Sequence, residues 1–213
     1  MEQDQITVKT ILFSTLRFYP TMLPVLGLVL TDAMNYCIQI SVLYRLVPKS
    51  ADQETNDLLT GLGIICFGVG CIVGGFLGGK LCDKFQLKKV ASFGALLYGL
   101  CCLSILGASF AESSALALGI YGFAGFEFSF IEGCEFVMCS RVFGGVAKSF
   151  AVVKHFQNVC VLAFQVVMLA TAGSIGVEYM MMVLVLAVVP AWVGLRRLPD
   201  GAPEKFSLLE TND

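Results

Sequence analysis

Carboxylic acids lie inside two long apolar runs of this sequence, where a charge is most costly. Asp32 lies in the run around residues 21–46, and Glu127, Glu132 and Glu135 lie in the run around residues 115–139. Ionisable groups at membrane depth usually mark a proton or ion pathway, or a paired site. Because apolar burial disfavours the charged form, we expect some of these acids to be neutral, to exchange protons or to bind a cation. Interhelical hydrogen bonds, worth roughly 0.6 kcal/mol each, are the structural alternative.

Amide side chains accompany the acid of the first run. Asn35 and Gln39 follow Asp32 by three and seven residues, so a helix places all three on one face. Glu132 and Glu135 also share a face, and no matching base stands beside the three acids of that run. A second polar set occupies the run around residues 150–172: His155, Gln157, Asn158 and Gln165. The first three lie near one end of that run, so an interfacial position accounts for them.

The composition predicts a membrane protein. Of the 213 residues, 57% are hydrophobic and 14% are charged, and the mean hydropathy is +0.81. Soluble domains carry about 25% charged residues, so most of this chain is predicted to face lipid or its own interior. A spanning helix needs about 20 mostly apolar residues. Six runs qualify: 21–46, 58–79, 89–109, 115–139, 150–172 and 177–195. We therefore expect an all-α integral membrane bundle of six transmembrane helices.

The basic residues predict the orientation of this bundle. One side collects twelve of the 14 lysines and arginines, and the other side has only Arg45 and Lys49. The twelve are Lys9, Arg17, Lys80, Lys84, Lys88, Lys89, Arg141, Lys148, Lys154, Arg196, Arg197 and Lys205. Basic loops stay in the cytoplasm, which predicts a cytoplasmic segment at 1–20, a membrane domain at 21–195 and a disordered cytoplasmic tail at 196–213. The expected location is the plasma membrane or an endolysosomal membrane.

The residue types argue against an enzyme. The sequence offers no nucleophile–base pair and no phosphate-binding loop, and its single histidine and nine cysteines form no metal-binding motif. Nearly all of the cysteines lie in apolar runs, where cysteine behaves as a small hydrophobic residue. We expect no cofactor, no metal and no nucleic-acid partner.

Glycines repeat along the second apolar run. Gly70, Gly74 and Gly78 are spaced by four residues, and Gly75 and Gly79 form a parallel pair. Small residues at this spacing let a neighbouring transmembrane helix approach closely. Simple close packing is one interpretation, and a smooth face that slides during a conformational cycle is the other.

The loop after this run resembles a short motif of the major facilitator superfamily. The stretch "GKLCDKFQLKK" matches it at Gly79, Asp83, Lys84, Lys88 and Lys89, whereas Gln86 stands at the place of the second glycine. In that superfamily the motif joins the second and third helices of a six-helix half, as it would here. The resemblance implies that Asp83 pairs with Arg141, at the end of the fourth run, and latches one conformation. The structural alternative is a solvated loop charge.

A second stretch resembles the Unc-type branch of that superfamily. Phe150, Lys154, Phe156 and Gln157 resemble an aromatic-rich stretch of that branch that carries Lys, Phe and Gln, and Glu127 stands where the branch has an aspartate. Lys154, His155 and Gln157 are therefore family-like positions. The resemblance covers roughly residues 20–195 and implies the C-terminal six-helix half of a twelve-helix protein.

Two classes of function follow from this resemblance. The chain is expected to be a solute or ion transporter-like half-module that works with a second six-helix bundle, either its own copy or another chain. That expectation includes polar faces of the first, fourth and fifth helices that would open onto lipid in one bundle alone. The alternatives are a non-transporting regulatory or trafficking partner of a channel or receptor, and a truncated form of a twelve-helix protein.

The tail also holds a short sorting-like stretch. In "EKFSLL", Glu204 stands four residues before the pair Leu208 and Leu209. This spacing resembles the acidic dileucine signals that adaptor complexes read on cytoplasmic tails. Short motifs match by chance, so the signal is an expectation about trafficking alone.

Overall fold

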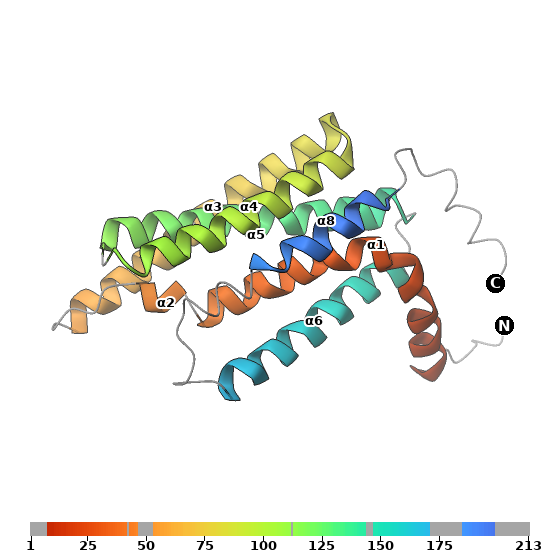
Figure 1. Cartoon of the computed structure of the whole chain (residues 1–213), viewed down its shortest axis with the longest axis horizontal. Coiled ribbons are helices and arrows are strands. Elements are labelled where there is room, and N and C mark those ends of the chain that lie inside the picture. The colour runs from red at the N-terminus through yellow and green to blue at the C-terminus, as the bar shows by residue number, and fades with distance from the viewer. Residues whose placement is uncertain are drawn as a thin grey trace, which may run out of the picture.

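The protein is described by a computed structural model that covers residues 8–41, 43–46, 53–111, 113–143, 147–170 and 185–198. Within these ranges the secondary structure consists of helices with short turns at their ends, and no strand is present. The helices lie side by side in a bundle (Figure 1). Their bounds are α1 Val8–Ser41, α2 Leu43–Leu46, α3 Gln53–Lys84, α4 Leu87–Ala108, α5 Ser114–Arg141, α6 Ala147–Ala170 and α8 Val188–Arg196.

Five of the described helices are long and apolar enough to cross a membrane. The qualifying segments are Tyr19–Ile38, Gln53–Lys84, Leu87–Ala108, Ser114–Arg141 and Ala147–Val167. They fall on the first five predicted runs. The sixth predicted run, 177–195, is described only from residue 185 onward, where α8 forms its last turns. The all-helical membrane class is therefore confirmed, whereas six spans stay a prediction.

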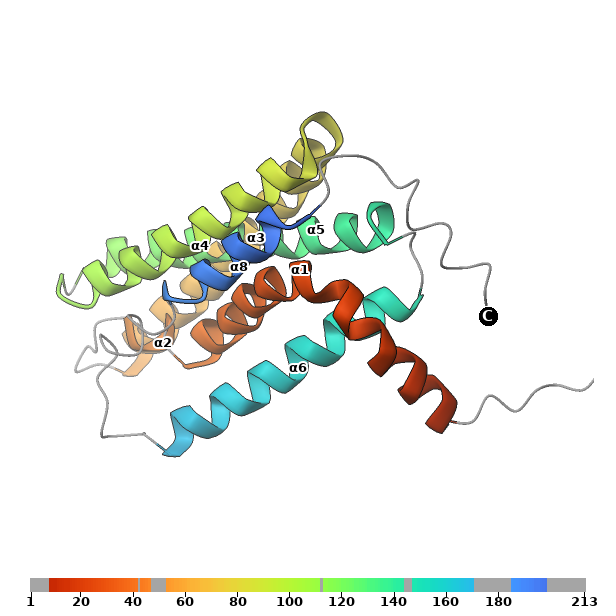
Figure 2. The same cartoon turned by 45° about the vertical axis from the view of Figure 1, so that its right-hand side comes forward.

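Two helix boundaries differ from the predicted runs. Helix α1 begins at Val8 rather than near residue 21, and α3 begins at Gln53 rather than at residue 58. Both helices extend into polar residues that precede the apolar run. Hydropathy alone therefore places their first residues too late. Within α1, Pro20 and Pro24 interrupt the backbone hydrogen bonds, and the ribbon bends away from the bundle in its first half (Figure 2).

Helix α5 lies at the centre of the arrangement. It packs against α3 along its length and also contacts α4 and α1. Helix α1 in turn packs against α6 and α8, so α5 and α6 are joined mainly through α1. Polar groups on α1, α5 and α6 can therefore meet at one place in the bundle.

The glycine stripe brings α3 and α5 into backbone contact. A methyl group at Gly70 would overlap the carbonyl oxygen of Gly122, and one at Gly74 would overlap that of Phe126. The relation is mutual, because a methyl group at Gly125 on α5 would overlap the carbonyl oxygen of Phe67 on α3. The close-packing interpretation describes this interface. Gly79 lies beyond it, since a methyl group added there would meet no neighbouring atom within 4 Å.

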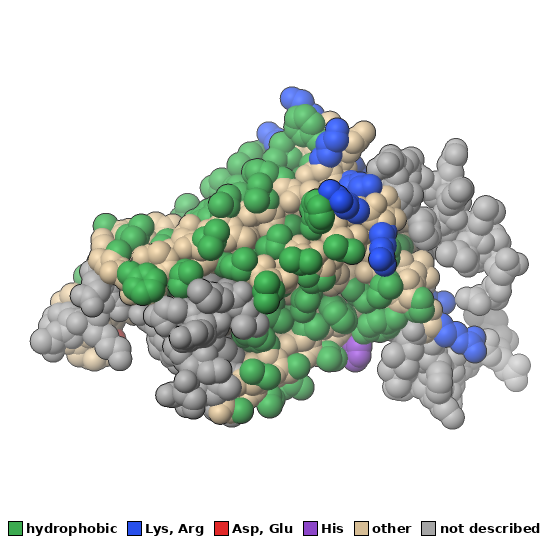
Figure 3. All heavy atoms as spheres, viewed as in Figure 1, with side chains coloured by type: hydrophobic (Ala, Val, Ile, Leu, Met, Phe, Trp, Pro, Cys, Tyr) green, Lys and Arg blue, Asp and Glu red, His purple; other side chains and the backbone are tan. Residues whose placement is uncertain are grey.

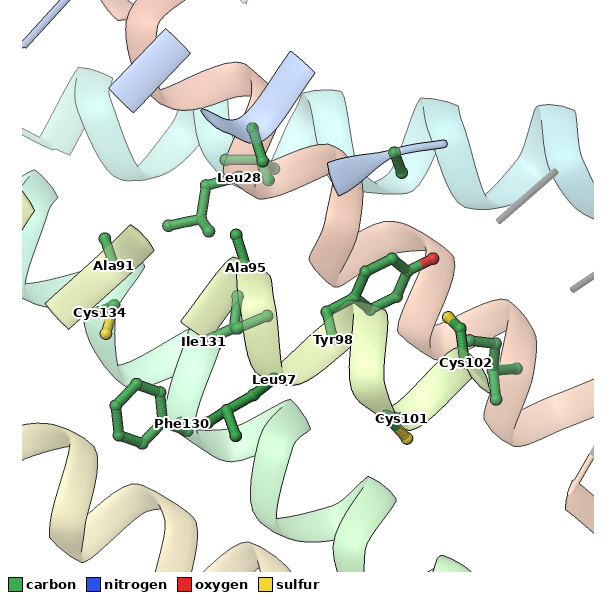
Figure 4. Packing of buried hydrophobic residues seen from close by; sticks show 14 of the residues in the cluster. Leu28, Ala91, Ala95, Leu97, Tyr98, Cys101, Cys102, Phe130, Ile131 and Cys134 are labelled. Atoms are coloured by element: carbon green, nitrogen blue, oxygen red, sulfur yellow. The ribbon is translucent and has the colours of Figure 1, made fainter. Parts of the chain in front are cut away.

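The apolar core fills the space between α1, α4 and α5. Tyr98, Phe130 and Ile131 are fully buried and pack near Leu28 (Figure 4). The outer surfaces are apolar as well: Ile72 on α3 is 76% exposed and Leu162 on α6 is 67% exposed. Hydrophobic side chains cover most of the described surface seen in Figure 3. An exterior of this kind suits contact with lipid.

Candidate functional site

A buried polar cluster lies where α1, α5 and α6 meet. Its fully enclosed members are Asp32, Asn35, Glu127, Glu135 and Gln157, each between 0% and 3% exposed. The helical repeat of about 3.6 residues places Asp32 and Asn35 on one side of α1, facing the other two helices. Such a set of ionisable and amide side chains stands apart from the apolar core around it.

One part of the cluster is an amide–acid pair. The side-chain nitrogen Nδ2 of Asn35 donates to Oε1 of Glu127 at 2.9 Å. The other oxygen of Glu127, Oε2, is buried and has no hydrogen-bond partner among the described residues. Glu127 therefore sits deep in the bundle with a single neutral donor.

A second part is a chain of hydrogen bonds between α5, α6 and α1. The ammonium nitrogen of Lys154 donates to Oε1 of Glu132 at 3.0 Å and to Oε1 of Gln157 at 2.9 Å. The amide nitrogen of Gln157 in turn donates to Oδ2 of Asp32. Gln157 therefore links a partly exposed ion pair to a fully buried acid.

The third part is a pair of acids. The carboxyl groups of Asp32 and Glu135 lie within hydrogen-bonding reach of one another. Counting only the donors that the described residues supply, Oδ1 of Asp32 and both oxygens of Glu135 have no partner. Buried polar atoms without a partner are rare and call for an explanation, such as a proton, a water or an ion.

Exposure falls along the cluster from one end to the other. The side chains of Lys154 and Glu132 are 37% and 25% exposed, whereas Asp32 and Glu127 are fully buried. Lys154 also lies over the ring of Phe136, with its nitrogen 5.2 Å from the ring centroid. The cluster thus has one edge at the surface of the bundle and one closed end.

The structure brings together most of the polar residues that the sequence analysis singled out. Glu127 contacts Asn35, and Glu132 and Gln157 both contact Lys154. His155 points elsewhere: it is exposed, with its ring edge-on to Tyr19 at a centroid distance of 6.1 Å. The side chain of Gln39 and the residues Glu204, Leu208 and Leu209 lie outside the described residues.

One expectation about these residues is wrong. Asp32 and Glu127 do not open onto lipid, because neighbouring helices of the same bundle enclose them. The structure also adds a basic neighbour from another helix, since Lys154 on α6 reaches Glu132 on α5. Gln157 is enclosed by the bundle and is 2% exposed, and its interfacial depth stays a prediction.

The loop motif between α3 and α4 forms a separate polar site. Arg141 contacts the carboxylate of Asp83 and also donates to the carbonyl oxygen of Cys82 at 3.0 Å. The predicted Asp83–Arg141 contact is therefore present, and its role as a latch stays a prediction. Lys88 does something the motif did not suggest: its ammonium donates to the carbonyl oxygens of Arg196 and Leu198, at 3.2 and 3.3 Å.

The remaining motif lysines lie at the surface. Lys84 is exposed, with its nitrogen 5.8 Å from the ring centroid of Phe85, and Lys89 is exposed on the first turns of α4. Among the residues that the structure describes, no group of three or more histidines, cysteines, aspartates or glutamates is arranged to hold a metal ion.

Comparison with known proteins adds no relative. The chain matches no protein-family model, no curated protein and no solved structure. The major facilitator resemblance therefore depends on the loop motif and on the aromatic-rich stretch at residues 150–157.

Proposed function

We propose that this chain is a transporter-like half-module of the major facilitator type, in which the buried polar cluster binds and releases protons as a solute or ion crosses the membrane. The observation that carries the proposal is the burial of Asp32, Glu127 and Glu135 within helices long enough to span a membrane, with carboxyl oxygens that find no donor among the described residues. A cluster built only for stability would be expected to satisfy its acceptors. Acids that change protonation must instead keep some of them free.

The position of the cluster along the bundle supports this function. At a rise of about 1.5 Å per residue, Glu135 lies about 9 Å and Glu127 about 21 Å along α5 from Arg141. The hydrocarbon core of a bilayer is about 30 Å thick. Glu127 stands at the centre of the 28-residue helix, so it would lie near the middle of the membrane if α5 is centred in the bilayer. Glu132, five residues closer to Arg141, and its partner Lys154 would lie nearer one face.

We further propose that the basic end of the bundle is cytoplasmic. Arg141 reaches Asp83, and Lys88 reaches the end of α8, so these ends of α3, α4, α5 and α8 lie together. The basic side chains visible in Figure 3 gather at that end. A basic end of this kind favours the cytoplasm, and both termini would then be cytoplasmic, in the plasma membrane or an endolysosomal membrane.

Proton flux tests the proposed function directly. The purified chain is reconstituted in liposomes that contain a pH-sensitive dye, and a potassium diffusion potential drives protons inward. We expect wild-type flux to exceed that of empty liposomes and the Glu127→Gln variant to abolish the excess. The Asp57→Asn variant, which changes an exposed acid on α3, is the matched control and should behave as wild type. Equal flux with Glu127→Gln would remove Glu127 from the mechanism.

A regulatory or trafficking partner of a channel or receptor is the second candidate function. It is favoured by the outer face of α6, where His155 and Asn158 are exposed beside apolar residues such as Leu162. An exposed amide at membrane depth suits an interhelical hydrogen bond to another chain. A second bundle, either a copy or another chain, could occupy this face.

Mass measurement separates these possibilities. The protein is purified in mild detergent, and light scattering gives its mass after subtraction of the detergent. A dimer or a complex with a second bundle supports the half-module, whereas a complex with a channel or receptor supports regulation. A stable, active monomer would contradict the need for a second bundle.

A further inference from the structure

We infer that Asp32 and Glu135 hold one proton between their carboxyl groups, and that Glu132 is the group through which this proton exchanges with water. Lys154 and Gln157 act as positioning residues in this exchange. The inference deepens the function proposed above, and its physiological role rests on that function. The proton pair itself can be tested without transport.

The two acids are in close contact inside the bundle. Asp32 and Glu135 are 0% and 1% exposed and lie within hydrogen-bonding reach. Ionised carboxylates only accept hydrogen bonds, so two of them cannot bond to one another. Like charges this close and this far from water do not both ionise. One retained proton turns the contact into an O–H···O⁻ hydrogen bond and provides partners for an oxygen of each acid.

Six titratable groups surround this pair of acids. The titratable groups that face it are Tyr36 on α1, Glu127, Glu132, Cys134 and Cys139 on α5, and Lys154 on α6. Among these groups Lys154 is the cation, and its ammonium is bonded to Glu132 and Gln157. A proton is therefore the counter-charge left for Asp32 and Glu135.

Glu132 provides a route between the buried pair and water. Glu132 lies close enough to Asp32 to interact with it electrostatically, and its side chain is 25% exposed. In the exchange, Glu132 takes a proton from water at the exposed edge, and this O–H bond breaks as an O–H bond forms on the ionised carboxyl group of the pair. One of the pair's two protons then returns to the Glu132 carboxylate and passes to water, so the pair never carries two charges. Lys154 holds Glu132 in position, and the amide of Gln157 holds Asp32 in position.

Infrared spectroscopy of the purified chain tests the shared proton. Near neutral pH we expect the carbonyl band of a protonated carboxylic acid in the wild type. Asp32→Asn and Glu135→Gln should each remove this same band, because the new amide supplies the hydrogen that the shared proton supplied. The double variant should lose no more than either single variant. Glu127→Gln should leave the band in place.

Several outcomes would overturn the pair. They are a wild-type spectrum without such a band, additive losses in the double variant, and a band that disappears only with Glu127→Gln. If a variant does not fold, isotopic labelling of the wild type replaces it. Carbon-13 in aspartate carboxyls and carbon-13 in glutamate carboxyls should each shift a shared band, whereas an isolated acid responds to one label alone.

The rate of hydrogen–deuterium exchange of this band tests the route. Glu132→Gln and Lys154→Met should slow the exchange about tenfold, which corresponds to about 1.4 kcal/mol in the barrier. Asn158→Leu changes an exposed polar residue of α6 and is the matched control. Unchanged exchange in Glu132→Gln would remove Glu132 from the route.

The two proposals fail in different ways. A shared band in a chain that shows no proton flux would end the transport function and leave the pair intact. Flux without a shared band would end the pair and leave Glu127 as the proton-binding group.

Discussion

Helix α5 has two faces that solve different problems. Toward α3, Gly125 and its neighbours meet a glycine stripe at backbone distance, with no room for a side chain. Toward α1 and α6, Glu127 and Glu135 carry acids into a polar cluster. Residues two apart, such as Gly125 and Glu127, point about 200° apart around a helix. One face therefore fixes the helix in place and the other presents its chemistry.

This division explains why acids can remain buried with unsatisfied oxygens. Buried acids without full partners destabilise the bundle, and the α3–α5 contact is the closest backbone packing in the described residues for which glycines provide the space. Dispersion contacts and aligned helix backbones on that side offset the disadvantage of the polar side. Substitutions on the two faces of α5, and at the loop and helix-end contacts beside them, should therefore differ in their effect on stability.

Adding a methyl group at the glycine contact between α3 and α5 should have the largest effect on stability. Gly74→Ala places a methyl group on the carbonyl oxygen of Phe126, so the two helices must separate. We expect a loss of roughly 1–3 kcal/mol in unfolding free energy, measured by denaturant unfolding in detergent micelles. Gly68→Ala is the matched control, because nothing lies within 4 Å of the added methyl group there. Equal losses in both variants would show that the close contact contributes nothing.

Removing the amide of the polar face should have the next effect. Asn35→Leu leaves Glu127 without its donor, and an unsatisfied buried acceptor costs about 1–3 kcal/mol. Glu127→Gln keeps an oxygen that Asn35 can donate to, so its loss in unfolding free energy should be smaller. A larger loss with Glu127→Gln would mean that the negative charge, and not the hydrogen bond, holds this pair.

Lys88 on α4, which bonds to the end of α8, should contribute less to stability. Lys88→Met removes the ammonium that donates to the carbonyl oxygens of Arg196 and Leu198. A cation at a helix C-terminus contributes roughly 0.5–1 kcal/mol. Thermal unfolding of Lys88→Met should show this loss, while Lys89→Met, on the exposed side of the same turn, should resemble wild type. No difference between them would make Lys88 an ordinary surface charge.

The contact between Asp83 and Arg141 should have the smallest effect on stability. Their side chains are 68% and 49% exposed, and solvent screening limits such pairs to about 0–1 kcal/mol. Asp83→Asn should therefore change unfolding free energy by less than that, and added salt should reduce the change further. If Asp83 latches one conformation, the same variant should change the rate of transport far more than stability. A large stability loss would make the pair structural.

The sequence predicts much of the fold because hydropathy is a local property. The glycine-rich run of α3 and the acid-bearing run of α5 are each apolar over enough residues to identify a spanning helix. Helix ends were harder to predict, since the stretch before Leu58 is polar and yet helical. The first helix shows the same difficulty at Val8.

The candidate site was only half predictable. Membrane depth marks Asp32 and Glu127 as unusual wherever they occur, so their types alone were informative. The partnership of Lys154 with Glu132 depends on how α6 crosses α1 and α5, and no spacing within one helix carries that information. The three-residue step from Lys154 to Gln157 places both on one face of a helix, and this signal in the sequence could have linked them.

The crossing of α1 and α8 has a consequence for how the bundle is made. Each helix offers a glycine to the other's proline: Gly27 lies against the carbonyl group of Pro190, and Gly194 lies against that of Pro24. Gly27 and Gly194 are 167 residues apart in the sequence, so α1 is synthesised well before the helix that packs against it. During synthesis, the small surface of Gly27 would face lipid or the insertion machinery until α8 is made. The α1–α8 contact therefore forms only after the helices between them have been synthesised.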